Sequence, residues 1–295
     1  MVRVFGTVIA GLLGLAFGSF LNVCVSRWPR GESVVRPRSC CEGCGRTLGG
    51  WENVPLLSWI LLRGRCRTCG AWIGWRTVLV EASVGVLWAI VGWRLLDWVF
   101  TPGLGNEALF FGVGAAMCRA LFYWMLIALA ALDAEHLWLP DSLTWPGIAI
   151  GVGYSAVPLS FGGEFALFRW GGNVHLRGAL AAMVSAGIAG GLVLLIRWLY
   201  WLIRRREGIG LGDAKLMAML GAWLGLKGAL LAFGLGVVLG AVVAVIAVIA
   251  MPRTGEAGSW AAMKLPLGSF LCIGGMVSGL WGEPIIQSYI RWAGF

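Results

Sequence analysis

Two short segments place an aspartate beside long apolar runs: residues 132–141 contain Asp133, and residues 207–215 contain Asp213. Ionisable groups at membrane depth are rare and tend to be functional. Two carboxyl groups that lie close together share a proton, so that one acts as a general base toward water and the other as a general acid. The two segments therefore predict peptide hydrolysis without a catalytic metal or a covalent intermediate, with Asp133 and Asp213 as the catalytic residues.

Four neighbouring residues are candidates for supporting roles. Gly210 and Gly212 carry no side-chain bulk, so a substrate backbone could approach Asp213 closely. Lys215 could tune the ionisation of Asp213, although an interfacial lysine more often extends toward the head groups. Asp141 directly follows a proline, and this order predicts that it caps the N-terminus of the next helix.

Structural interpretations of the same residues stay open. Asp213 could cap the helix that follows it, and Asp133 could be a helix-end charge in the head-group zone. His136 would share a helical face with Asp133. A metal pair there is disfavoured, because the chain contains only two histidines.

Residues 27–77 contain five of the eight cysteines, and four of these form two C-x2-C pairs separated by 21 residues: Cys41, Cys44, Cys66 and Cys69. This spacing predicts a four-thiolate zinc site. Four thiolates leave no open position for a catalytic water, so we expect the zinc to be structural and to supply folding energy to a short polar loop. A glycine follows each pair, where the turn favours a positive φ.

Three further features of this segment bear on the prediction. Cys40 adjoins Cys41 and could compete as a ligand, but the spacing favours Cys41. Disulfides are disfavoured if the loop is cytoplasmic, because that compartment is reducing. Glu81 could anchor the zinc loop to the helices, or it could be an exposed charge near the start of a helix.

Long apolar runs must position these residues. The chain is 59% hydrophobic and 13% charged, against roughly a quarter charged in soluble domains, and its mean hydropathy is +0.83. We predict an all-α polytopic membrane protein with a small zinc-binding loop domain. One run, 214–226, is too short to span a bilayer and predicts a half-helix. The eight expected segments are Val4–Val25, Val78–Trp98, Ala108–Leu132, Leu143–Ser160, Gly178–Ile203, Ala214–Leu226, Ala229–Met251 and Leu265–Trp281.

Charge predicts the orientation. Nine arginines and three glutamates give residues 27–77 a net charge of +6, out of +9 for the chain. The positive-inside rule places this loop in the cytoplasm, and alternation then places both aspartate segments and the 252–264 loop on the same side. Topology and anionic lipid account for the basic patch without nucleic acid. We expect three parts: a first membrane helix retained as an anchor (1–26), a zinc-binding domain (27–77) and a polytopic domain (78–295).

Several motifs in order resemble those of one family. Four segments are similar to the motifs of the bacterial prepilin peptidases, also called type IV leader peptidases. They are residues 18–23 with Arg27, residues 53–59 between the cysteine pairs, residues 132–144, and residues 207–215. The resemblance covers nearly the whole chain. One departure is Glu42, where the family often has proline after the first cysteine, with Cys40 added before the pair.

The resemblance implies a function and a site. Such enzymes use an aspartate pair, here Asp133 and Asp213, to cut the basic leader from type IV pilin-like precursors after a glycine, at the cytoplasmic face of the bacterial inner membrane. They then methylate the new terminal residue, typically phenylalanine, with S-adenosylmethionine, and the resemblance links residues 27–77 to this methyltransferase activity. The implied partners are prepilins or pseudopilins and membrane lipid. The chain shows no glycine-rich nucleotide-binding unit for the methyl donor.

Three other functions remain as alternatives. Another intramembrane aspartic protease would share the G-x-G-D motif but would not need the paired cysteines. A proton- or ion-coupled transporter with a zinc-bound regulatory loop would be favoured by an internal repeat, and we find no convincing one. A scaffold of a secretion machine would tolerate Asp-to-Asn changes at both sites.

Overall fold

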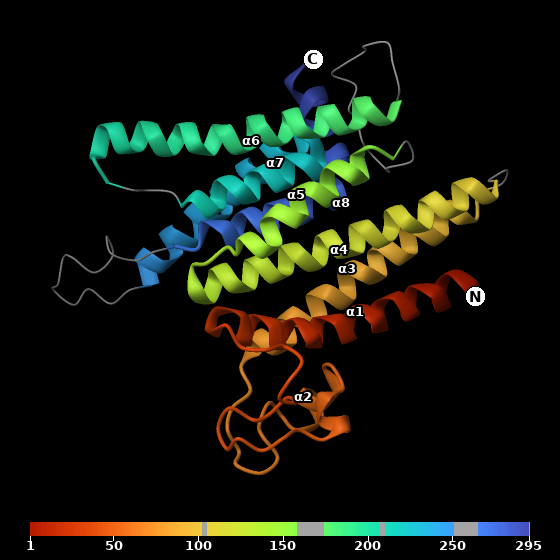
Figure 1. The fold of residues 1–295 in the computed structure, drawn as a ribbon, viewed down its shortest axis with the longest axis vertical. Helices are drawn as coiled ribbons and strands as arrows, with labels where there is room; N and C mark the ends of the chain where they lie inside the picture. The colour runs from red at the N-terminus through yellow and green to blue at the C-terminus, as the bar shows by residue number, and fades with distance from the viewer. Residues whose placement is uncertain (102–104, 158–173, 207–209, 251–264, 295) are drawn as a thin grey trace. The chain divides into compact units, whose positions relative to one another are not determined.

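The computed structural model describes residues 1–101, 105–157, 174–206, 210–250 and 265–294. These residues are helical apart from short connections and from residues 28–74, which contain three short helical turns and two isolated β-bridges. This confirms the predicted all-α class. Figure 1 shows the helices that these residues form: α1 Val2–Arg27, α2 Leu57–Leu61, α3 Trp75–Val99, α4 Asn106–His136, α5 Asp141–Ser155, α6 Val174–Arg204, α7 Leu211–Ala250 and α8 Leu267–Ala293.

Six described helices (α1, α3, α4, α6, α7 and α8) are long and apolar enough to cross a membrane. With 15 residues, α5 is shorter than the roughly 20 that a span requires. The 40-residue α7 is two helices joined at Gly225, whose φ of 68° and ψ of 176° are not helical. Each of the eight expected segments thus corresponds to a helix, except that residues 158–160 and 251 lie outside the described residues.

The first half of α7 has the burial expected for a half-helix within a bundle. Leu216, Met217 and Leu220 are fully buried there, whereas Val238 and Ile249 in the second half are largely exposed. An exposed apolar surface of this kind is stable against lipid. The break at Gly225 lies close to the predicted one, between Leu226 and Ala229. Residues before the break are buried among the other helices, and many residues after it are exposed.

The chain forms two compact units, Met1–Ala131 and Leu132–Phe295. In the first unit α1 packs closely along α3. A Cβ at Gly14 would lie 2.8 Å from the Val84 carbonyl oxygen, and one at Gly18 would lie 2.8 Å from the Glu81 Cα atom. Small residues spaced in this way let membrane helices approach each other. The boundary between units differs from the predicted boundary between the zinc-binding and polytopic domains at residues 77 and 78. The latter stays a prediction.

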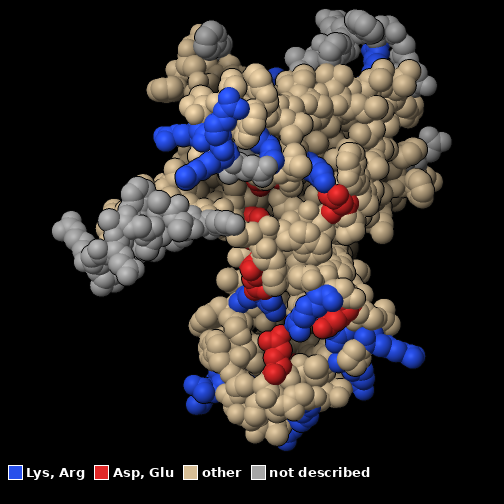
Figure 2. Space-filling model, turned by 60° about the vertical axis from the view of Figure 1, so that its left-hand side comes forward, with Lys and Arg blue, Asp and Glu red and all other residues tan. Residues whose placement is uncertain are grey.

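Glu81 links the loop domain (residues 28–74) to α3. Its side chain is buried, with 4% exposure, and its carboxylate accepts a hydrogen bond of 2.8 Å from the Leu56 N–H. Leu56 has a positive φ of 58°, which is uncommon for a side-chain-bearing residue. The anchoring role considered for Glu81 is therefore confirmed. In Figure 2, charged side chains crowd the lobe formed by this domain, and most of the visible helical surface is uncharged.

The second unit consists of the end of α4 and of α5 to α8. Its helices are held by side chains that donate to carbonyl oxygens of neighbouring helices. The Trp223 indole of α7 donates to the Gly147 carbonyl of α5 at 2.8 Å, and the Ser278 hydroxyl of α8 donates to the Gly228 carbonyl of α7 at 2.8 Å. Buried polar groups need such partners, so these bonds hold α5 and α8 in place against α7.

Candidate active site and metal centre

Asp133 lies in the last turn of α4 and meets the first turn of α8. Its side chain is buried, and the residue is 6% exposed. Its Oδ2 accepts a 2.7 Å hydrogen bond from the Ser269 N–H and a 3.2 Å hydrogen bond from the Ser269 hydroxyl. The N-terminus of a helix stabilises negative charge through its free N–H groups and its dipole. A Cβ at Gly268 would lie 2.9 Å from the same oxygen, so a glycine is needed there.

Asp213 is the third residue of α7, and its Oδ2 accepts a 3.1 Å hydrogen bond from the Gly210 N–H. An acidic residue at this position of a helix binds the N–H of the residue before the helix in the same way in a capping box. Asp213 is therefore not the N-cap considered from the sequence, because α7 begins at Leu211; it lies inside the first turn and makes the second contact of a capping box. Capping leaves its other carboxylate oxygen out of this bond, so it is compatible with a chemical role.

The two aspartates both lie in the second unit, and one side chain packs next to the surroundings of each. The Leu139 side chain packs against Gly212, which precedes Asp213, and against Gly268, which contacts Asp133. A Cβ at Gly212 would be 3.0 Å from the Leu139 Cβ, and one at Gly268 would be 2.9 Å from the Leu139 Cδ1. The 137–140 connection thus packs between the first turns of α7 and α8, which carry the groups that hold the two carboxylates.

Three supporting residues make contacts that the sequence did not indicate. Asp141 is not an N-cap, because α5 begins at Asp141 itself, after Pro140, and no side chain caps it. The carboxylate of Asp141 instead pairs with Lys215 at 2.5 Å, so this lysine links α7 to α5. Gly212 faces Leu139 rather than open space. Its missing side chain therefore makes room for the connection, and the approach of a substrate backbone to Asp213 stays a prediction.

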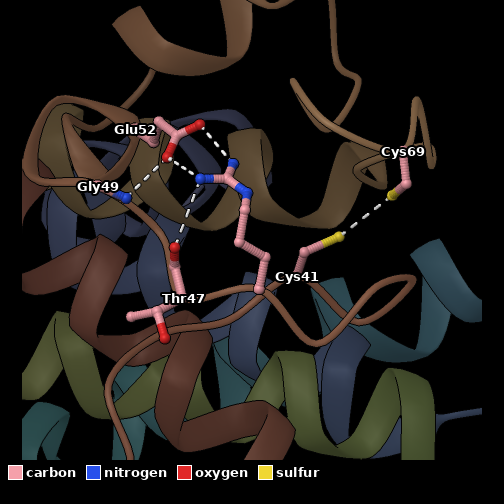
Figure 3. Close-up of polar contacts among 6 residues, drawn as sticks. Cys41, Thr47, Gly49, Glu52 and Cys69 are labelled. Carbon is pink, nitrogen blue, oxygen red and sulfur yellow. Dashed lines mark hydrogen bonds and ion pairs between the residues drawn. The ribbon is translucent and has the colours of Figure 1, made fainter.

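The four paired cysteines converge in the loop domain. Their sulfur atoms all lie within 4.8 Å of one another, and the sulfurs of Cys41 and Cys69 are 3.7 Å apart (Figure 3). Four sulfurs at about 2.3 Å from a tetrahedral zinc would be separated by about 3.8 Å. All eight cysteines are free thiols, and Cys40 lies outside the cluster. The arrangement fits one metal ion. Among the described residues no cluster of this kind includes His136.

The two cysteine turns have the same backbone geometry. Gly45 donates its N–H to the Cys41 carbonyl at 2.8 Å, and Gly70 donates to the Cys66 carbonyl at 3.0 Å. Both glycines have a φ of 69°, as predicted. The N–H groups of residues 69 and 68 lower the pKa of Cys66 below its usual value, which favours the thiolate that binds metal.

A half-buried ion pair that the sequence did not indicate supports the first cysteine turn. Arg46 donates two hydrogen bonds to the Glu52 carboxylate, of 2.7 and 3.1 Å, and the Gly49 N–H donates a third of 2.7 Å (Figure 3). The Arg46 guanidinium, and then the Gly49 N–H, lower the pKa of Glu52 to about 2. The carboxylate is therefore charged throughout the physiological range, and it holds the turn that follows Cys44.

We expect Glu52→Gln to lower the temperature at which the loop domain releases its metal by roughly several degrees, measured with a chromophoric chelator during heating. The folded pKa lies below the ordinary value of 4.5, so the ion pair contributes fully above pH 4.5 and is lost only as the pH falls toward 2. The difference between wild type and variant should therefore be equal at pH 8 and pH 6. A difference that shrinks between these values would contradict this account.

The contact of Gly268 and Ser269 with Asp133 was also not predicted from the sequence. They follow Pro266 at the start of the last apolar run, where a glycine and a serine are ordinary helix-start residues. The available signal was position, because this end of the run was predicted to lie on the same side as both aspartates. Only the packing of α8 against the end of α4 shows that they contact Asp133.

The fold and the two clusters define a class of protein: a polytopic helical membrane protein with a pair of aspartates and a four-cysteine metal-binding cluster. A family model described as the type IV leader peptidase family matches residues 120–245, which include both aspartates, and a model of the bacterial peptidase A24 N-terminal domain matches residues 12–95. The chain belongs to the type IV leader peptidase family. This membership confirms that the protein is a peptidase and a multi-pass membrane protein, and it removes the support for a transporter or a scaffold.

Curated relatives extend over nearly the whole chain. A protein of Pseudomonas aeruginosa is 33% identical over 96% of this chain and 93% of its own, and one of Stutzerimonas stutzeri is 34% identical over the same shares. A third, from Burkholderia pseudomallei, is 36% identical over 92% of this chain and 84% of its own. Each is named prepilin leader peptidase/N-methyltransferase. No solved structure matches the chain.

Proposed function

We propose that this protein removes the basic leader from type IV pilin-like precursors by hydrolysis with Asp133 and Asp213. The observation that carries the proposal is the placement of both carboxylates at helix N-termini in the second unit, next to the shared Leu139. The names of the relatives supply the class of substrate. Two interacting carboxyl groups have the chemistry that peptide hydrolysis requires, since one takes a proton from water and the other gives one.

The hydrogen bonds favour different roles for the two residues. Asp133 receives two hydrogen bonds from Ser269 at the N-terminus of α8, and such bonds stabilise the charged form. Asp213 receives one. We therefore assign Asp133 as the base that takes a proton from the attacking water. Asp213 then donates its proton to the carbonyl oxygen of the scissile peptide, and one carboxyl returns a proton to the leaving amine.

The membrane supplies the substrate geometry. We propose that the protein lies in the bacterial inner membrane with the site and the loop domain on the cytoplasmic side, as the excess of arginine in residues 27–77 favours. A precursor with a basic leader and an apolar helix would present its scissile bond where the two meet. Both aspartates lie in end turns of apolar helices, so they would meet that bond at the interface.

We further propose that Cys41, Cys44, Cys66 and Cys69 hold a structural zinc ion, and that the protein N-methylates the new terminal residue with S-adenosylmethionine. The sulfur separations support the first proposal. The second rests on the printed names of the relatives. A test is cleavage of a purified prepilin or pseudopilin in proteoliposomes with the methyl donor, read by intact mass. Loss of the leader and gain of one methyl group are expected. An uncut precursor would contradict the peptidase assignment for that client class.

The assignment of Asp133 as the base predicts a graded effect of changes at Ser269. Ser269→Ala removes the hydroxyl donor and keeps the N–H, so we expect kcat for leader cleavage to fall roughly three- to tenfold. The acidic limb of the pH–rate profile should move to higher pH, because the charged form of Asp133 loses a donor. Ser269→Thr keeps a hydroxyl and should restore both.

Ser288→Ala is the matched control, since it removes a hydroxyl from the opposite end of α8, where its partner is the Pro284 carbonyl. It should leave the profile unchanged. A Ser269→Ala enzyme with a reduced kcat and an unmoved profile would show a structural role for Ser269 and no effect on the ionisation of Asp133.

A further inference from the structure

A cavity in the first unit is lined by residues of two sequence motifs that lie outside the aspartate site and the cysteine cluster. Its volume is about 380 Å³, within the range of small-molecule sites. One wall is a face of α1, and the others come from residues 34–39 and 53–55 of the loop domain. Ser19, Phe20 and Arg27 belong to the first motif, and Asn53 and Pro55 belong to the motif between the cysteine pairs. Motifs far apart in the sequence thus line one cavity.

The walls of the cavity are held by buried groups. The Arg27 guanidinium is buried, and it donates to the carbonyl oxygens of Ser33 at 2.9 Å and Arg38 at 3.4 Å. These bonds hold the 33–38 segment against the end of α1. On the opposite side, the Glu81 carboxylate accepts a hydrogen bond from the Leu56 N–H, next to Pro55 of the wall. These hydrogen bonds connect both loop segments of the wall to α1 or α3.

The lining has two kinds of chemistry. Phe20, Val23, Pro37 and Pro55 present apolar surface, which suits a flat heterocycle and methylene groups. Arg38 lines the same space. Its exposed side chain makes none of the hydrogen bonds or ion pairs found among the described residues, so its guanidinium is available for a carboxylate.

We propose that this cavity binds S-adenosylmethionine, the methyl donor of the proposed N-methylation, with Arg38 holding its carboxylate. The proposal rests on the methyltransferase part of the proposed function. In the reaction, the lone pair of the substrate's neutral terminal amine forms the nitrogen–carbon bond as the carbon–sulfur bond breaks. The sulfur keeps that electron pair and leaves as the thioether, and the methylated nitrogen releases a proton to water.

The test is direct binding of S-adenosylmethionine to the purified full-length protein in detergent, by titration calorimetry and by photocrosslinking of radiolabelled donor with peptide mapping. We expect Arg38→Ala to weaken binding at least tenfold, and Val23→Trp, which fills the cavity, to abolish it. Arg36→Ala is the matched control, because it removes an exposed arginine two positions away that does not line the cavity. Crosslinks should map to residues 16–27, 34–39 or 53–55.

Each outcome bears on a separate claim. Unchanged affinity in both Arg38→Ala and Val23→Trp, with melting temperatures like that of wild type, would overturn the cavity assignment. Methylation by those variants would then leave the methyltransferase function standing with its donor bound elsewhere. A wild-type protein that cuts leaders but neither binds donor nor methylates would overturn both claims and leave the peptidase. Lost binding with crosslinks outside the three segments would also overturn the assignment.

Discussion

Asp133→Asn and Asp213→Asn should each reduce leader cleavage by roughly 10³-fold or more, because each removes a group that must gain or lose a proton in the reaction. Asparagine keeps the size of the side chain and can still accept a hydrogen bond from the Ser269 or Gly210 N–H, so both variants should fold. The measurement is the initial rate of cleavage of a purified precursor, with the product identified by intact mass. The double variant should be no slower than the slower single one, since the two residues act as a unit.

Glu135→Gln is the matched control for these variants. Glu135 precedes the end of α4 by one residue, as Asp133 does by three, but its side chain is about one-third exposed. Its rate should stay within about twofold of wild type. If a folded Asp133→Asn or Asp213→Asn protein still cuts at the wild-type rate, the two aspartates have only the capping and packing roles that the structure shows for them.

Cys66→Ser should remove the metal from the loop domain and unfold that domain. A structural zinc ion contributes about 10–16 kcal/mol to the folding of small metal-binding domains, and residues 28–74 contain few buried apolar side chains to replace it. We expect zinc content, measured by elemental analysis after dialysis, to fall to background. Trypsin should then cut at arginines between residues 30 and 67 faster than in the wild type, because an unfolded backbone fits the protease more readily than a folded one.

Cys40→Ser is a close control, because Cys40 lies in the same loop, next to a ligand, but outside the cluster. It should retain zinc and be cut by trypsin at the wild-type rate. Retention of metal by Cys66→Ser, or loss of metal in Cys40→Ser, would show that the ligand set differs from the four cysteines that the sequence spacing predicts and the structure brings together.

Several features could be predicted from the sequence because they depend on local spacing or on the length of a run. The two C-x2-C pairs predict a metal cluster, since each pair lies within one turn whose geometry its own residues set. The apolar runs predict the membrane helices, because bilayer thickness sets their length. Motifs around Asp133 and Asp213 identified the candidate carboxylates, and their order along the chain indicated the family that the comparisons confirm.

Tertiary structure alone decided what surrounds these groups. Ser269 is 136 residues from Asp133, and the contact exists only because α8 packs against the end of α4. The same holds for the pairing of Lys215 with Asp141, which the sequence had assigned to other roles, and for Leu139 filling the space beside Gly212. Local patterns specify helices, turns and metal ligands. Which helix ends meet depends on the packing of whole helices, and no residue carries that information by its type or spacing.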